Sequence, residues 1–101
     1  MAFVDAGKVE ELTPGKMKGV IIGNTSILIA NVDGRYYATG GKCTHMGGNL
    51  SKGILTGKIV TCPLHGTQFD VTTGKVIGGP AKKDLQVYPV KKEGNTIKVD
   101  A

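Results

Sequence analysis

Short apolar runs separated by turn sequences fill the first third of the chain. Residues 19–23 and 26–32 are rich in Ile and Val, and a turn at residues 23–25 joins them. Asp33-Gly34 then leads into residues 35–39. An Asp-Gly pair between two β-rich runs is a strong hairpin signal. This part of the chain therefore predicts three consecutive antiparallel strands.

The C-terminal end has the same pattern of two predicted strands joined by a turn. Residues 86–91 and 96–100 are predicted strands on either side of a turn at residues 93–95, and Pro89 restricts its strand to a sheet edge or a bulge. Near the N-terminus, a single helical turn is expected at Val9 to Leu12, before Thr13-Pro14-Gly15 stops it. The pattern as a whole predicts an all-β fold.

The middle of the chain, about residues 40–80, has a different character. It holds most of the sixteen glycines, and short apolar runs such as residues 58–61 and 67–71 alternate with them. Such a segment buries too little apolar surface to order itself, so we expect a bound metal to cross-link it. The sequence predicts one domain, residues 1–101, with this lobe inserted into a β base formed by residues 1–39 and 81–101.

The chain carries no signal for a membrane or for export. No apolar run approaches the roughly 18 residues that a membrane-spanning helix needs. The N-terminus also lacks the charged start and long apolar stretch of a signal peptide. We therefore expect a cytoplasmic location and no membrane contact.

All cysteines and histidines of the chain lie in two short segments of the lobe. Cys43 and His45 form a C-x-H pattern, and Cys62 and His65 form a C-x₂-H pattern. Thiolate and imidazole are typical ligands of transition metals. A disulfide between the cysteines would suit a secreted protein and would leave both histidines unexplained. These four residues are therefore predicted metal ligands.

The order of the ligands favours iron–sulfur over zinc. Structural zinc sites usually pair like ligands, whereas each segment here offers one cysteine and one histidine. In a two-iron cluster this order can place both thiolates on one iron and both imidazoles on the other. Neighbouring glycines let backbone N–H groups approach the sulfides. A zinc-stabilised binding module is the alternative, and it would be colourless.

The two segments also resemble a known family. Residues 43–48, Cys-Thr-His-Met-Gly-Gly, and residues 62–66, Cys-Pro-Leu-His-Gly, are similar to the cluster-binding boxes of Rieske [2Fe–2S] proteins. The resemblance is strongest to small soluble Rieske ferredoxins, including those that serve ring-hydroxylating oxygenases. It continues through residues 69–75 and 85–90 and so covers most of the chain.

The resemblance implies a fold of stacked antiparallel sheets that holds one [2Fe–2S] cluster near its tip. Carried over by position, Cys43 and Cys62 would bind one iron, and His45 and His65 the other. Residues 78–81 resemble the loop of that family that covers the cluster, with Pro80 at its centre.

Departures from the high-potential branch of the family bear on the reduction potential. That branch has a cysteine in each box that together form a disulfide, and the corresponding residues here are Gly48 and Leu64. It also has Ser and Tyr hydroxyls that donate to cluster sulfurs, where this chain has Thr67 and Phe69. Such donors raise the reduction potential, and Phe69 has no hydroxyl to donate. We therefore expect a reduction potential in the lower half of the range of roughly −150 to +300 mV.

The net charge is concentrated around the predicted cluster. Residues 42–83 hold six lysines and one acid, while the rest of the chain has seven basic and seven acidic residues, so the formal excess of +5 lies in this segment. A basic rim would steer an acidic redox partner. The alternative is a solvated surface that keeps the protein soluble. Nucleic acid is disfavoured, because the lobe lacks arginines and stacking aromatics.

These observations predict a one-electron carrier and not an enzyme. Both histidines are used as ligands, no spare cysteine nucleophile remains, and no catalytic constellation is visible. We expect a monomer that takes electrons from a reductase and passes them to an acceptor such as an oxygenase. The alternative is a Rieske-like small subunit of a multisubunit oxidoreductase.

Overall fold

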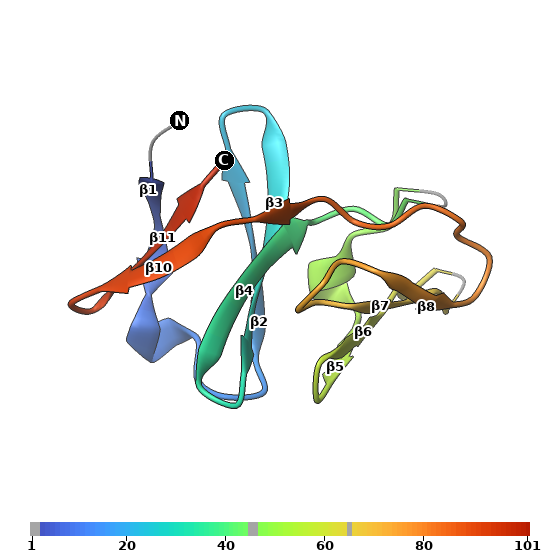
Figure 1. The fold of residues 1–101 in the computed structure, drawn as a ribbon, viewed down its shortest axis with the longest axis horizontal. Helices are drawn as coiled ribbons and strands as arrows, with labels where there is room; N and C mark the ends of the chain where they lie inside the picture. Colours follow the sequence, from blue (N-terminus) through green and yellow to red (C-terminus); the bar gives the residue numbers. More distant parts are fainter. Residues whose placement is uncertain (1–2, 45–46, 65) are drawn as a thin grey trace.

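In the computed structural model the regular structure consists almost entirely of three antiparallel sheets (Figure 1). The structure describes residues 3–44, 47–64 and 66–101. The strand orders of the three sheets are β1-β11-β10, β2-β3-β4-β9 and β5-β6-β7-β8. The strands are β1 (Phe3–Lys8), β2 (Met17–Ile22), β3 (Thr25–Val32), β4 (Arg35–Gly40), β5 (Ile54–Thr56), β6 (Ile59–Thr61), β7 (Gln68–Asp70), β8 (Val76–Gly78), β9 (Val87–Tyr88), β10 (Val90–Glu93) and β11 (Thr96–Asp100).

Two regions follow one another along the 39 Å length of the molecule. The proximal region, residues 3–40 and 87–101, carries the first two sheets. The distal region, residues 41–86, carries the β5-β6-β7-β8 sheet and lies at the other end in Figure 1. The predicted all-β fold is confirmed. The boundaries of the inserted lobe at about residues 40 and 80 remain a prediction.

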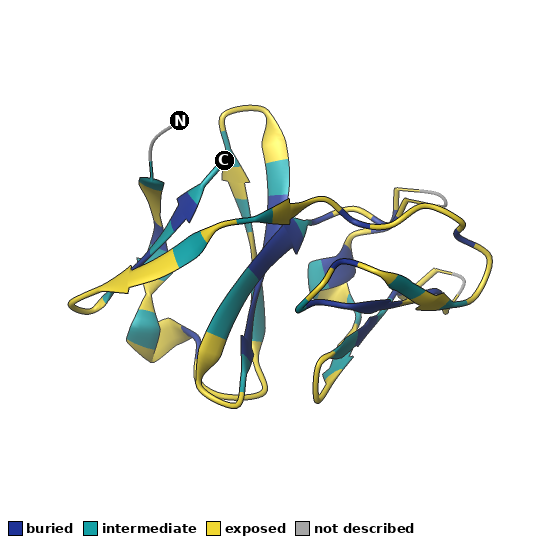
Figure 2. Cartoon of the chain, viewed as in Figure 1, coloured by how far each residue is buried: buried dark blue, intermediate teal, exposed yellow. Residues whose placement is uncertain are grey.

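Strand β3 separates two hydrophobic cores and contributes side chains to both. Ile27 and Ile29 pack into the proximal core, and Leu28 and Ala30 pack into the distal core. Successive side chains of a strand point to opposite faces, so both faces of β3 are covered. This explains the continuous apolar run in its sequence and its continuous burial (Figure 2).

The predicted hairpins of the proximal region are confirmed. Asp33 and Gly34 both have positive φ, 53° and 90°, as the turn between β3 and β4 requires. Gly23, with φ 63°, lies in the turn between β2 and β3. The expected helical turn is present as a short 3₁₀ helix, η1 (Val9–Glu11).

The single strand predicted for residues 86–91 is wrong. Pro89 divides it into β9, which pairs with β4, and β10, which pairs with β11. Proline has no N–H to donate to a ladder, and the chain passes from one sheet to the other at this residue. Three short or terminal strands, β1, β5 and β8, lie where the local sequence pattern predicted none.

Close backbone contacts attach the distal region to the proximal one. The second 3₁₀ helix, η2 (Leu50–Lys52), packs on β2. A Cβ on Gly19 would lie 2.8 Å from Ser51 Oγ, so glycine permits this approach. The Gly41 N–H donates to the Ser26 carbonyl at 2.8 Å. No helix in the described part of the chain is long and apolar enough to cross a membrane.

Candidate metal centre

The first predicted ligand segment begins a tight loop closed by two backbone hydrogen bonds. The Cys43 N–H donates to the Gly48 carbonyl at 2.8 Å, and the Gly47 N–H donates to the Cys43 carbonyl at 2.8 Å. Gly47 has φ 73°, in the left-handed region that favours glycine. The cysteine is thus held at the start of a loop whose far end returns to it.

The second segment repeats this pattern with the same offsets from its cysteine. The Cys62 N–H donates to the Thr67 carbonyl at 2.8 Å, and the Gly66 N–H donates to the Cys62 carbonyl at 3.2 Å. Gly66 also has φ 73°. The two cysteines therefore occupy equivalent positions in two loops of matching backbone hydrogen bonding.

Both cysteines are free and buried, with only 4% and 3% of Cys43 and Cys62 exposed. They belong to the distal core, where Phe69 is also buried. A Cβ on Gly48 would lie 2.9 Å from Cys62 Sγ, so the absence of a side chain there leaves space for this sulfur. The loops approach one another without a disulfide between the cysteines.

The donor chemistry fits a metal centre that uses sulfur ligands. His45 and His65, the other two predicted ligands, lie outside the described residues. Among the described residues, no three His, Cys, Asp or Glu side chains are grouped as a metal site would require. Two buried thiols in matching loops, each loop with one histidine in its sequence, therefore make the donor set that the chain offers.

Gly48 and Leu64 face each other across the two loops. A Cβ on Gly48 would lie 3.0 Å from Leu64 Cδ1, and the Leu64 side chain is otherwise exposed. By the resemblance described above, these positions correspond to the extra cysteines of the high-potential branch. Here neither residue is a cysteine, and their effect on the potential remains a prediction.

A third segment packs on the second loop. The Thr67 side chain is fully buried, and its Oγ1 accepts the Ala81 N–H at 3.4 Å. Gly79 has φ 94°, and a Cβ there would lie 2.6 Å from Thr67 Cα. Residues 79–81, with the exposed Pro80, therefore lie against the second loop. The expected roles of Thr67, Phe69 and Pro80 in tuning the potential remain predictions.

A cleft beside the first loop was not predicted from the sequence. Its volume is about 520 Å³. It is lined by residues from two distant segments: Gly40, Lys42, Thr44, Lys83, Asp84, Leu85 and Gln86. The run of lysines indicated a basic surface, but only the tertiary structure brings these two segments together.

Most lysines of residues 42–83 have no carboxylate partner. Within the described part of this segment the one ion pair joins Lys58 Nζ and Asp70 Oδ2 at 3.4 Å. Burial acts to raise the pKa of Asp70, but hydrogen bonds from the Thr72 hydroxyl and N–H, together with Lys58, outweigh it and lower this pKa. The acid is therefore ionised and already paired, and the other lysines remain available.

Comparison with known proteins gives one consistent family. The family described as Rieske [2Fe-2S] domain matches residues 2–89. The biphenyl dioxygenase ferredoxin subunit of Pseudomonas sp. (strain KKS102) is 42% identical over 101 residues, covering 99% of this chain and 93% of the relative. The ferredoxin component of the naphthalene 1,2-dioxygenase/salicylate 5-hydroxylase systems of Ralstonia sp. is 40% identical, covering 94% and 91%.

Solved structures have the same fold. A ferredoxin of Sphingomonas yanoikuyae B1 superposes with a TM-score of 0.92 at 29% identity, covering 99% of both chains. A chain from a complex of reduced oxygenase and oxidized ferredoxin in carbazole 1,9a-dioxygenase superposes with a TM-score of 0.91 at 30% identity. That match covers 96% of this chain and 91% of the other. The expected stacked-sheet architecture is thus found in proteins similar to this one.

Proposed function

The chain belongs to the family of Rieske [2Fe-2S] domains, and we propose that Cys43, His45, Cys62 and His65 hold one cluster through which it carries single electrons. The observation that supports this most directly is the pair of matching loops. Each begins with a buried free cysteine and contains one histidine in its sequence. A centre bound by both loops would join them at the tip of the distal region.

The residues of the chain would position this group and limit its contact with water. When bound, the cluster supplies reversible one-electron chemistry. Cys43 and Cys62 would provide thiolates from within the distal core. Gly48 leaves the space at the Cys62 sulfur, and residues 79–81 lie over the second loop. No side chain is assigned to bond making, so the protein would act as a non-catalytic component.

The partners are proposed from the relatives. Two relatives are named as ferredoxin components of dioxygenase systems, and one similar solved chain is part of a complex of oxygenase and ferredoxin. By this similarity we propose a reductase as electron donor and a terminal oxygenase as acceptor, met in the cytoplasm. The chain spans 93% of the Pseudomonas ferredoxin subunit, so the similarity that supports this proposal extends over nearly the whole of that relative.

Metal analysis and EPR spectroscopy test the proposal. The purified protein should be reddish-brown, contain about two irons and two acid-labile sulfides per chain, and give a [2Fe–2S] EPR signal on reduction. Cys62→Ser should lose the signal, because it removes one of two thiolates. Gln68→Ala, an exposed change close to the same loop, should keep it. A protein that contains one zinc and no iron would contradict the proposal.

A further inference from the structure

We propose that the cleft between Lys42 and Lys83 receives a carboxylate side chain of the acidic protein partner that exchanges electrons with this chain. The inference rests on the proposed electron-carrier function and specifies where and how the partner is held. The cleft lies beside the first ligand loop and has a volume of about 520 Å³. A carboxylate placed there would hold the surface of the partner against the tip of the distal region.

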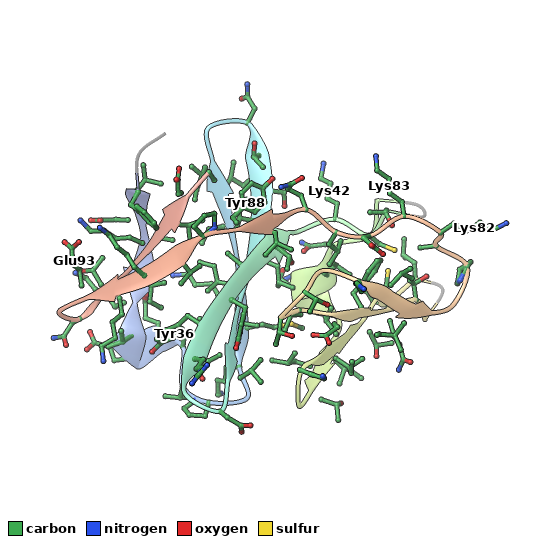
Figure 3. The ribbon with its side chains drawn as sticks, in the orientation of Figure 1. Tyr36, Lys42, Lys82, Lys83, Tyr88 and Glu93 are labelled. Carbon is green, nitrogen blue, oxygen red and sulfur yellow. The ribbon has the colours of Figure 1, made fainter. Side chains whose placement is uncertain are left out.

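Two lysines from distant parts of the chain line this cleft, and Lys82 does not. Figure 3 shows the Lys42 and Lys83 side chains extending in the same direction from neighbouring segments, whereas Lys82 points away around the end of the molecule. Adjacent residues in the sequence therefore present their charges to different surroundings.

The charge in the cleft is only partly balanced from within. Its one acid, Asp84, accepts the Val76 N–H through Oδ1 at 2.9 Å and forms no ion pair with either lysine, so two ammonium groups and one carboxylate leave a formal excess of +1. Among the described residues, neither Lys42 nor Lys83 has a carboxylate within ion-pair distance. The remaining residues, 1, 2, 45, 46 and 65, carry no side-chain carboxylate. An incoming carboxylate would therefore be the first anionic partner of these lysines.

The backbone beneath the two lysines is fixed to the first loop. Thr44 Oγ1 donates to the Lys83 carbonyl at 2.5 Å, and Thr44 directly follows Cys43. Lys42 forms a β-bridge with Asn49 at the base of the same loop. The lysine backbones are therefore held relative to the predicted ligands while their ammonium groups remain free. Charge pairs placed in this way orient a partner as well as attract it.

The cleft fits a protein carboxylate better than nucleic acid. Its two cations are lysines, which bind a compact anion as point charges, and it contains no arginine or aromatic side chain. Partner recognition at such a rim depends strongly on ionic strength.

Binding of a fluorescein-labelled tetra-aspartate peptide tests the inference. Fluorescence anisotropy at low ionic strength would give the Kd for the oxidised holoprotein. Lys42→Gln and Lys83→Gln should each weaken binding about three-fold, the size expected for an exposed ion pair, and the double variant should weaken it about ten-fold. Lys82→Gln removes the same charge one residue away and should leave the Kd nearly unchanged.

Three results would overturn the inference. An equal loss in Lys82→Gln would mean that the peptide responds only to overall charge. Unlabelled inorganic phosphate competing as well as unlabelled tetra-aspartate would mean a small-anion site. No measurable binding would mean that the cleft holds no carboxylate. Iron content and EPR of the same samples separate the two proposals. An intact cluster without peptide binding removes only this inference, whereas a missing cluster removes the electron-carrier function and the inference with it.

Discussion

The proximal and distal regions reach order by different means. Three of the proximal strands, β2, β3 and β4, run for six to eight residues, whereas each of the four distal strands has three. Proximal ion pairs join Lys18 to Glu11, Lys91 to Glu93, and Lys98 to both Asp5 and Glu93. In the described distal residues only Lys58 and Asp70 pair. The proximal region is held by long ladders and several ion pairs, whereas the described distal residues have short ladders and one ion pair.

The composition of the two cores extends this difference. The proximal core is formed by aliphatic residues, among them Leu12 and Ile97. The distal core includes both cysteines and takes Leu28 and Ala30 from β3 of the proximal region. The distal region therefore depends on a neighbouring strand on one side and, in our proposal, on a bound cluster on the other. Its stability should be coupled to its function, while that of the proximal region should not.

Loss of the cluster should produce the largest difference in hydrogen-exchange protection between the two regions. In Cys62→Ser, which removes one thiolate, amide hydrogens of β5, β6 and β7 should exchange at least about 100-fold faster, because local opening is no longer resisted by the cross-link. Amides of β3 and β11 should keep most of their protection. Hydrogen exchange followed by mass spectrometry would measure both. Equal acceleration throughout the molecule would mean that the regions do not differ in this way.

Truncating one buried leucine in each core should show whether the cluster depends on the distal core alone. Leu50 and Leu12 are almost completely buried, at 0% and 1% exposed, in the distal and proximal cores respectively. Each change to Ala should lower the free energy of unfolding by about 2–5 kcal/mol. Only Leu50→Ala should also release iron before global unfolding, because its cavity lies in the core that contains the cysteines.

Thermal denaturation followed by circular dichroism and by the visible absorbance of the cluster would test this pair. The two signals should coincide in Leu12→Ala and separate in Leu50→Ala. Coincident signals in both variants would show that one cooperative unit includes the whole molecule.

Local signals made much of this structure predictable. The Asp33-Gly34 turn depends on residues close in sequence, and the structure has this turn as expected. The assignment of Cys43 and Cys62 as ligands also rests on a local pattern, and it remains a prediction. The change of sheet at Pro89 depends on which edges are open in the folded molecule. The cleft depends on a contact between Thr44 and Lys83, 39 residues apart. Neither feature has a signature in the local pattern.

The smallest expected effect concerns the acids of the two regions. The side chain of Asp70 is 10% exposed and that of Glu93 is 55% exposed. Burial acts to raise the pKa of Asp70, but the Thr72 hydrogen bonds and Lys58 outweigh it, so its pKa lies below the ordinary 3.8. Hydrogen bonds from Lys91 and then Lys98 lower the pKa of Glu93. Both carboxylates stabilise the fold when ionised, but solvent screens only Glu93 strongly.

Asp70→Asn should therefore lower the free energy of unfolding at pH 7 by about 1.5–3 kcal/mol, the range for hydrogen bonds to a charged group, and Glu93→Gln by much less. A carboxyl whose pKa is lowered on folding contributes fully above its unfolded pKa, and this contribution is lost as pH falls through the folded pKa. The difference between Asp70→Asn and the parent should thus shrink below pH 3.8. Urea denaturation at several pH values, with and without 1 M NaCl, would measure it. Salt should abolish the effect of Glu93→Gln and leave that of Asp70→Asn; equal sensitivity to salt would show that the distal acid is no better shielded than the proximal one.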